Sequence, residues 1–250
     1  MNVNVFASGS SGNCVVINDD IIIDAGAYCP VVGSALLLTH NHTDHTKEIK
    51  RYAGLPIYTS QDVADRLSQK FPYITFSVIH PEQTYEIKGV HGSYYVKPIQ
   101  LEHDVPCIGF DIVHGDERIL YATDFASIQS DVDLSVYTQL FLECNNTLLP
   151  SDIMDVLITD DKPRDEFHRR KSYYNHCNIG YLIGLFERNG YTEQNRCEIP
   201  LTLLHKSSYY YLAHSERLIE LCKIANVQNP LMELVRNGGK NVCYNLNESK

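Results

Sequence analysis

The segment His40-Asn41-His42-Thr43-Asp44-His45 carries three histidines and an aspartate within six residues, directly after the apolar run Ala35–Leu38. The first two histidines stand two residues apart after a predicted strand, so both rings can reach one cation from the same short loop. The aspartate and the third histidine come where a helix is expected to begin, within reach of a second cation. Imidazole nitrogen and carboxylate oxygen are ligands that zinc and manganese accept. The segment predicts a metal centre at the end of a buried strand; a polar loop that is His-rich by chance is the alternative.

Four ligands from one loop cannot complete two coordination spheres, so other strand ends are expected to supply the rest. Three residues of ligand type meet this expectation, each at the end of an apolar run: His103, Asp124 and His205. Taken singly, each is as consistent with a core histidine or a turn aspartate as with a metal ligand. As an ordered set behind the histidine segment, they predict a dinuclear site.

This ordered set resembles that of the metallo-β-lactamase-fold hydrolases, from about Val5 to the helix after His205. The resemblance implies two divalent cations, Zn²⁺ or Mn²⁺. It implies that the first cation is held by His40, His42 and His103, the second by Asp44, His45 and His205, and that Asp124 bridges them. It also implies that Asp24, at the end of the run Ile21–Ile23, lies behind the loop and orients a ligand. An Asp-Ala-Gly turn is the alternative for Asp24.

The expected chemistry is hydrolysis. Two cations about 3.5–4 Å apart can share a hydroxide, lower the pKa of its parent water and clamp an ester or phosphoryl oxygen. Asp44 is suited to orient or deprotonate that water while it also touches the metal. Zinc has no redox chemistry, and oxygen-using members of the fold more often carry an acidic residue where His42 stands.

The turn Ser8-Gly9-Ser10-Ser11-Gly12-Asn13 lies between two predicted strands. Its backbone N–H groups and hydroxyls could meet phosphate oxygens, and a small-residue hairpin is the alternative. The turn closely resembles the N-terminal turn of the YycJ (WalJ)-like branch, single-domain proteins regarded as DNA exonucleases. On this resemblance Ser10, Ser11 and Asn13 are possible phosphate contacts.

His176 stands just before a predicted helix and resembles a histidine of the same branch and the proton-donating histidine of tRNA 3′-processing relatives. The segment departs from the branch pattern because Asn175 replaces a glycine and Cys177-Asn178 replaces the usual small-residue pair. The resemblance implies that His176 is catalytic and protonates the leaving oxygen near a helix N-terminus. The run Glu143-Cys144-Asn145 also resembles the branch, and we expect it to give structural support.

The sequence has 31 acidic and 21 basic side chains, which leaves a formal net charge of -10. This acidic balance excludes a protein that coats nucleic acid tightly. Two dications would add about +4 at the site and leave roughly -6, so a DNA or nucleotide substrate is expected to be bound locally. Lys206 and the charged run Lys162–Lys171 could contact phosphates, although a solvated loop is an equal interpretation of the run.

The predicted fold is an α/β, four-layer αββα sandwich in one domain over residues 1–250, because short apolar strands fill the first half and strands mix with helices in the second. Helices are predicted at Asp44–Tyr52, Gln61–Lys70, Asn178–Arg188 and Tyr211–Ile224. The eight cysteines form no CxxC pair, so free thiols in a reducing cytosol are expected. No apolar run suits a membrane span or a signal peptide, which favours a cytoplasmic protein.

These features predict a dinuclear-metal phosphodiesterase, foremost a DNA exonuclease. A small-molecule hydrolase, acting on a cyclic nucleotide, a lactone or another ester, is the second reading. A metal-binding sequestering protein without turnover is the third. The native metal, the polarity of any exonuclease and the oligomeric state are left open at this level.

Overall fold

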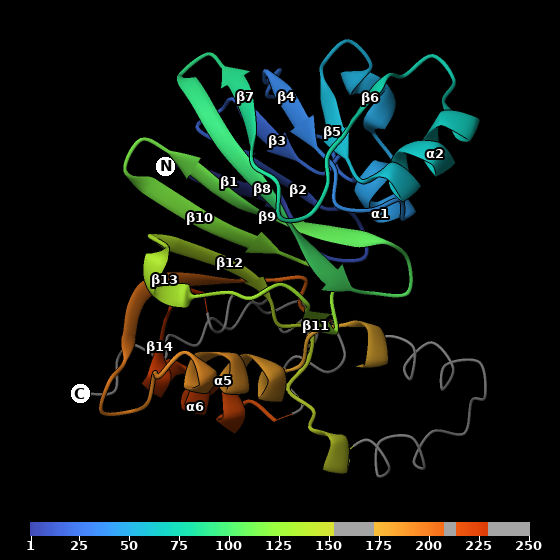
Figure 1. The fold of residues 1–250 in the computed structure, drawn as a ribbon. Helices are drawn as coiled ribbons and strands as arrows, with labels where there is room; N and C mark the ends of the chain where they lie inside the picture. Colours follow the sequence, from blue (N-terminus) through green and yellow to red (C-terminus); the bar gives the residue numbers. More distant parts are fainter. Residues whose placement is uncertain (153–172, 208–213, 230–250) are drawn as a thin grey trace, which may run out of the picture.

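Two β-sheets pack face to face in the computed structural model, which describes residues 1–152, 173–207 and 214–229 (Figure 1). The first sheet has the strand order β1-β2-β3-β4-β5-β6, and its strands are Val3–Ala7, Cys14–Ile17, Ile21–Ile23, Ala35–Leu37, Ile57–Thr59 and Phe76–Val78. The second has the order β11-β8-β9-β10-β12-β13-β14, with β7 also pairing with β8. From β7 to β14 its strands are Tyr85–Gly89, Gly92–Glu102, Cys107–His114, Glu117–Ala122, Ser127–Ile128, Gln139–Glu143, Cys197–Leu204 and Ala225–Val227.

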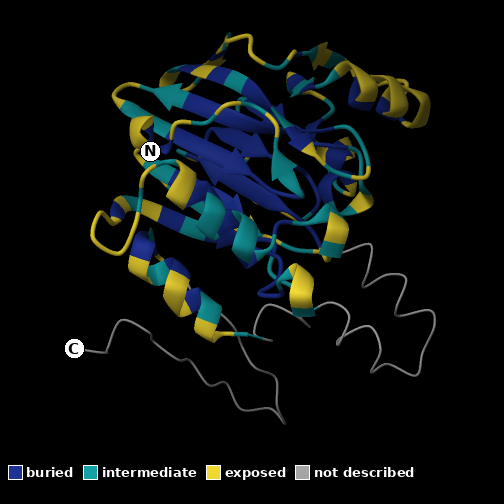
Figure 2. Cartoon of the chain, turned by 60° about the horizontal axis from the view of Figure 1, so that its bottom comes forward, coloured by how far each residue is buried: buried dark blue, intermediate teal, exposed yellow. Residues whose placement is uncertain are grey.

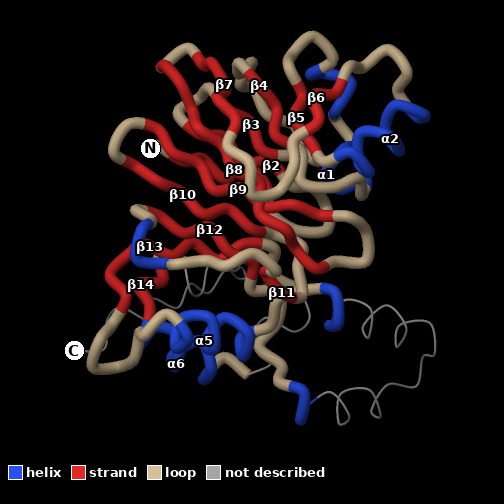
Figure 3. Tube along the Cα trace, in the orientation of Figure 1, coloured by secondary structure: helices blue, strands red, loops and turns tan. Residues whose placement is uncertain are grey.

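Helices cover the outer face of each sheet (Figures 1 and 3). The first sheet carries α1 (Thr43–Thr46), the 3₁₀ helix η1 (Ile49–Tyr52) and α2 (Gln61–Lys70). The second carries α5 (Ile179–Arg188), α6 (Glu216–Ile224) and the 3₁₀ helix η2 (Leu134–Val136). The predicted αββα sandwich is therefore confirmed.

The apolar core forms three layers, one between the sheets and one beneath each set of helices, and the strands appear as the buried interior in Figure 2. Strand β2 shows why both faces must be apolar. Val15 and Ile17 enter the layer between the sheets, whereas Cys14 and Val16 enter the layer under the first helices. Successive side chains of a strand point to opposite faces, so a strand buried on both sides reads as a continuous apolar run.

Parallel pairing brings several strand ends to one edge of the molecule. In the first sheet β3 pairs with β4 in parallel, with Ile23 opposite Leu37. In the second, β10, β12 and β13 are parallel, with Ala122 opposite Leu142 and Glu143 opposite Leu204. The carboxyl ends of parallel strands lie at the same edge of a sheet, which is where open α/β sheets bind ligands.

The prediction of one helix over Asp44–Tyr52 is wrong, because the chain breaks between α1 and η1. The break has a tertiary cause. Ala25 N donates to His45 O at 2.8 Å, and Glu48 N donates to Ala25 O at 2.7 Å. The backbone at Glu48 thus pairs with the loop after β3 instead of continuing the helix.

The helix predicted over Tyr211–Ile224 begins at Glu216 in the structure, and part of the predicted range lies outside the described residues. Strands β6, β11 and β14 were not predicted, since each has only two or three residues. The seven cysteines in the described part of the chain are free, as expected. None of the helices described here has the length and apolar character that a membrane span requires.

Candidate metal centre

The three ligands predicted from strand ends, and Asp24 behind them, lie within two residues of the end of a strand in the structure. Asp24 follows β3, His103 follows β8, Asp124 comes two residues after β10, and His205 follows β13. Asp24, Asp124 and His205 have positive φ angles of 61°, 55° and 48°. Such angles are uncommon outside glycine and gather at functional sites, where the surrounding structure sustains the strain.

A first cluster joins His40 and His42 to His103 and Asp124. One donor atom from each of these four residues lies within 4.8 Å of the others. The rings of His40 and His42 have their centroids 4.7 Å apart, so the two-residue spacing does bring both imidazoles to one place. His40 is fully buried, whereas the His42 side chain is 33% exposed and marks the open side of the cluster.

A second cluster joins Asp44, His45 and His205 to the same Asp124. Asp124 Oδ1 lies 3.4 Å from His45 Nε2 and 3.5 Å from His205 Nε2, and Asp44 Oδ2 lies 3.8 and 3.9 Å from these nitrogens. Two ligands bound at about 2.1 Å to one tetrahedral cation are about 3.4 Å apart, so these separations suit a shared cation. Asp124 belongs to both clusters, as a bridging carboxylate must.

The Nδ1 atoms of the expected histidine ligands meet oxygen atoms on the side away from the clusters. His45 Nδ1 lies 2.8 Å from Asp24 Oδ2, and His40 Nδ1 lies 3.0 Å from Thr39 Oγ1. His103 Nδ1 lies 2.9 Å from the carbonyl oxygen of Asn175. The Asp24 carboxylate and the Asn175 carbonyl can only accept, and the Thr39 hydroxyl already donates to Asp24, so these contacts hold the proton on Nδ1 and leave Nε2 free to bind a metal.

The donor set fits a metal by a second observation. The buried Nε2 atoms of His40, His103 and His205 make no hydrogen bond within the described part of the chain. A buried polar atom without a partner is costly and rare, so two of them in the first cluster and one in the second need an explanation. Divalent cations bound there would satisfy all three. The Nε2 atom of His45 does have a partner, because Asn13 Nδ2 lies 2.8 Å from it. The Asn13 side chain would have to move away for a cation to bind there.

The carboxylates dominate the electrostatics of the centre. Burial and the neighbouring His45 hold the pKa of His40 well below its usual 6.5. Burial also opposes protonation of His45, but the carboxylates of Asp24 and Asp124 outweigh it and raise its pKa to about 10. The pKa of Asp124 is lowered well below its usual value despite burial, because His205 and His45 lie beside it. The site carries an excess of negative charge that cations would offset.

His176 reaches the same centre from the loop before α5. Its ring stacks on that of His205 at 4.9 Å between centroids with an angle of 6° between the planes. Its Nδ1 lies 2.6 Å from Glu143 Oε1, and Glu143 is fully buried at the end of β12. Burial opposes protonation of His176, but the Glu143 carboxylate raises its pKa above the usual 6.5.

Glu143 is more central than the sequence indicated. Its Oε2 accepts backbone N–H groups from Phe125 at 2.8 Å and Cys177 at 3.3 Å, and its Oε1 lies 3.2 Å from His205 Nδ1. It therefore ties His176, His205 and the loop after β10 together. Thr39 and Asp104 also contact the histidines and were not singled out, because a Thr or an Asp beside a His carries no distinctive pattern.

The serine-rich turn lies against the second cluster. Asn13 is buried and donates to Gly9 O and the main chain of Asp44, whereas Ser10 and Ser11 are exposed. Ser8, in the same turn, accepts a hydrogen bond from the His205 backbone N–H at 2.8 Å. The turn thus braces the loops that carry the second cluster, and its exposed serines stay a prediction as phosphate contacts.

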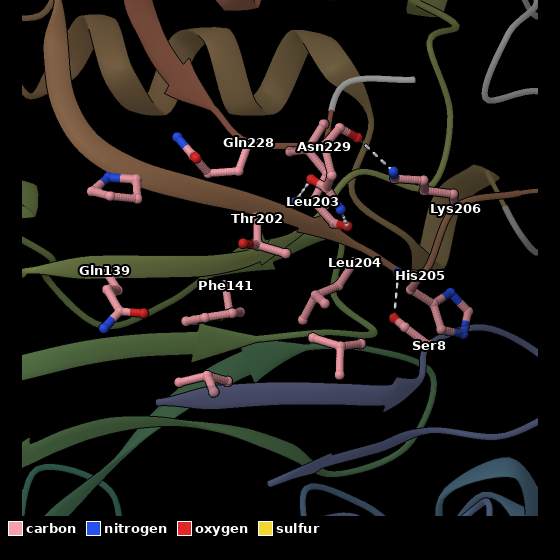
Figure 4. A pocket seen from close by; sticks show the side chains of 13 residues that line it. Ser8, Gln139, Phe141, Thr202, Leu203, Leu204, His205, Lys206, Gln228 and Asn229 are labelled. Carbon is pink, nitrogen blue, oxygen red and sulfur yellow. Dashed lines mark hydrogen bonds between the residues drawn. The ribbon is translucent and has the colours of Figure 1, made fainter. Parts of the chain in front are cut away.

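Lys206 lies beside the centre, in a groove of about 650 Å³ along β13 (Figure 4). Its Nζ donates to the carbonyl oxygen of Asn229 at 2.7 Å. Of the residues that line the groove, only His205 belongs to the clusters. Phosphate contact by Lys206 therefore stays a prediction. The run Lys162–Lys171 lies outside the described residues.

Three solved structures show a similar fold. The metallo-beta-lactamase fold protein YhfI from Bacillus subtilis is 19% identical over 90% of this chain and 94% of its own, with a TM-score of 0.61. Zn²⁺-bound PqqB from Methylobacterium extorquens is 14% identical over 91% and 97%, with a TM-score of 0.62. The short form of human tRNase Z is 13% identical over 83% and 93%, with a TM-score of 0.51. At these identities the likeness concerns the fold alone.

Sequence comparison gives the family. No curated protein matches this sequence. The family model of the beta-lactamase superfamily domain matches residues 30–155, half of the chain, and this range contains the histidine segment, His103 and Asp124. Together with the αββα sandwich and the solved structures above, this match shows that the chain belongs to the beta-lactamase superfamily and has the metallo-β-lactamase fold.

Proposed function

We propose that this protein is a dinuclear-metal phosphodiesterase that acts on DNA, as do the exonucleases of the YycJ-like branch it resembles. The observation that carries the proposal is the pair of clusters that share Asp124, with His176 beside them and oriented by a buried glutamate. Two divalent cations, Zn²⁺ or Mn²⁺, would act there as Lewis acids that lower the pKa of a water and offset the charge on a phosphoryl oxygen.

Asp44 and His176 would have different roles in the reaction. Asp44 is 24% exposed and lies within 4 Å of His45 and His205, so its carboxylate can orient the attacking water and accept a proton from it. His176 uses Nδ1 to donate to Glu143, so Nε2 is the atom that would protonate the leaving oxygen. A sugar hydroxyl is a poor leaving group without a proton, which is why a positioned acid favours a phosphodiester substrate.

Comparison with known proteins supports a metal-dependent nuclease. The human tRNase Z, which shares the fold, is a nuclease by its name, and PqqB holds zinc. We propose from this likeness that the centre binds divalent metal and that its substrate is a nucleic acid. DNA is favoured over RNA only by the resemblance of the serine-rich turn.

A small-molecule phosphodiesterase or esterase is the second candidate. The observation that favours it is the net charge of -10, because a long polyanion gains affinity mainly from many basic contacts. A short substrate such as a cyclic nucleotide needs only the metal centre.

The test compares wild type with Asp44→Asn on labelled single- and double-stranded DNA, after loading with Zn²⁺ or with Mn²⁺. Asp116→Asn, in the exposed turn after β9, is the matched control. We expect wild type and the control to shorten DNA and Asp44→Asn to lose at least about 100-fold in rate, since it removes the proton acceptor. Metal content is measured in the same samples.

A parallel panel contains cyclic nucleotides, p-nitrophenyl phosphodiesters and lactones. Hydrolysis of these with no action on DNA would select the second candidate. Two bound metal equivalents with no hydrolysis of any ester would instead indicate a metal-sequestering protein and would refute the proposed enzyme.

A further inference from the structure

Asp104 lies at the open side of the first cluster, in the loop between β8 and β9. Its Oδ1 is 3.1 Å from His103 Nε2 and 3.4 Å from His42 Nε2. His103 Nδ1 is occupied by the carbonyl oxygen of Asn175, so Nε2 is the nitrogen that His103 has left for a cation. The Asp104 side chain is 17% exposed, although the residue as a whole is exposed.

The two distances are those of ligands on one cation. Ligands held at about 2.1 Å and separated by angles of about 90–110° lie about 3.0–3.4 Å apart. Asp104 Oδ1 meets this condition toward both His42 and His103. Asp104 is not among the donors that all lie within 4.8 Å of one another, so the loop must move slightly for this oxygen to bind a cation held by the two nitrogens.

We propose that Asp104 is a fifth protein ligand of the cation held by His40, His42, His103 and Asp124. The inference rests on the proposed function only in that it needs a cation at this cluster. The second cluster offers four donors, from Asp44, His45, Asp124 and His205. The two positions thus differ in ligand number, whereas each would have two carboxylates.

This difference has a consequence for metal preference. Zn²⁺ in proteins is most often four-coordinate, whereas Mn²⁺ suits higher coordination numbers and oxygen-rich sites. The first position, with five donors, suits Mn²⁺ by its coordination number. The second position, with four donors, suits Zn²⁺. Asp104 is the residue that creates the distinction.

The test measures metal binding directly and not turnover. Wild type, Asp104→Ala and the control Glu102→Ala are titrated with Mn²⁺, followed by electron paramagnetic resonance of the free ion, and with Zn²⁺ against a chromophoric chelator. Glu102 is exposed, bonds Ser127 Oγ at 2.5 Å and carries the same charge two residues away, so it corrects for long-range electrostatics. A circular dichroism spectrum of each variant confirms folding.

We expect Asp104→Ala to weaken one of two Mn²⁺ sites by about 10-fold or more, as loss of a metal-site partner does. Zn²⁺ binding should change by less than about threefold, because the remaining three histidines and Asp124 complete a four-coordinate site. Asp104→Asn, which keeps one oxygen donor without the charge, should lie between wild type and Asp104→Ala for Mn²⁺. Glu102→Ala should bind both metals as wild type does.

Equal Mn²⁺ affinity in wild type and Asp104→Ala would overturn the inference, and so would an equal loss in Glu102→Ala. These results are distinct from failure of the proposed function. If wild type binds two metals and does not cleave phosphodiesters, the function fails and the ligand assignment can still hold. If wild type cleaves DNA and Asp104→Ala binds Mn²⁺ unchanged, the ligand assignment alone fails.

Discussion

At the scale of single residues, Asp24 shows how a buried carboxylate prepares a metal ligand. It accepts hydrogen bonds from Thr39 N and Thr39 Oγ1 at 2.9 Å each, and it lies 2.8 Å from His45 Nδ1. It is fully buried behind the histidine segment, with no direct part in either cluster. We propose that it holds His45 with Nε2 toward the expected cation.

The substitution Asp24→Asn tests this role. Asparagine tolerates the positive φ at this position, so the backbone should be retained. Loss of the charge should lower metal affinity at the second position by about 10–100-fold, the usual effect of removing a partner behind a ligand. Metal content after dialysis against a graded chelator measures it. Asp19→Asn, also at positive φ but exposed, should keep two metals, and full occupancy in Asp24→Asn would contradict the assignment.

Glu143→Gln tests the orientation of His176. Glutamine keeps the shape of the side chain but not the charge that holds the His176 imidazole at 2.6 Å. The rate on DNA should fall by about 10²-fold, the lower range for general-acid catalysis. The rate on a p-nitrophenyl phosphodiester should fall much less, because nitrophenolate leaves without a proton. An equal loss on both substrates would show that Glu143 acts through His205 and the metal instead.

At the scale of elements, strand and helix bounds were predicted best where the local pattern is unambiguous. Strand β3, the run Ile21–Ile23, and helix α2 have the predicted bounds, since a β-branched run and an apolar face at helical spacing suffice to define them. The helix expected over Asp44–Tyr52 failed because Ala25, distant in sequence, takes the hydrogen bonds at its centre. Local periodicity carries no information about such a partner.

Helix α6 is fixed to the loop after β12 by a contact that should depend on pH. Arg217 donates to Thr147 O at 2.7 Å and to both carboxylate oxygens of Asp152. The hydrogen bonds from Arg217 lower the pKa of Asp152 to about 2. A lowered pKa contributes stability that is complete above the unfolded value of about 4 and is lost as pH falls toward 2.

Arg217→Met should therefore lower the free energy of unfolding by about 1 kcal/mol at pH 7. The difference between variant and wild type should shrink below pH 4, be small at pH 2 and disappear below it. Urea unfolding at a series of pH values measures it. A difference that persists unchanged at pH 2 would mean that Arg217 stabilises α6 through packing and its bond to Thr147 rather than through the ion pair.

At the scale of the whole molecule, the candidate metal centre joins the two sheets. His40, His42 and His45 come from the loop after β4 of the first sheet, and Asp124 and His205 come from the ends of β10 and β13 of the second. A cation in either cluster would be bound by both sheets at once. Metal binding should then stabilise the packing of one sheet on the other.

Thermal unfolding tests this link. Removal of metal with a chelator should lower Tm, and saturation to about 100 times Kd should add about 2.7 kcal/mol per site to the free energy of unfolding. Asp124→Asn, which removes the carboxylate shared by both clusters, should lose most of this increment. An increment as large in Asp124→Asn as in wild type would show that the metals bind elsewhere.

The sequence by itself determined the chemistry of the centre: the ligand types, their positions just beyond apolar strands and the layered architecture. These depend on local spacing and side-chain chemistry, which a linear pattern carries. Only the tertiary structure decided which ligands meet, because parallel pairing of β3 with β4 and of β10, β12 and β13 sets which strand ends are neighbours. For the same reason, only the tertiary structure placed Glu143 behind His176 and Asp104 beside His42 and His103. The sequence around each of these residues does not indicate which residue it contacts.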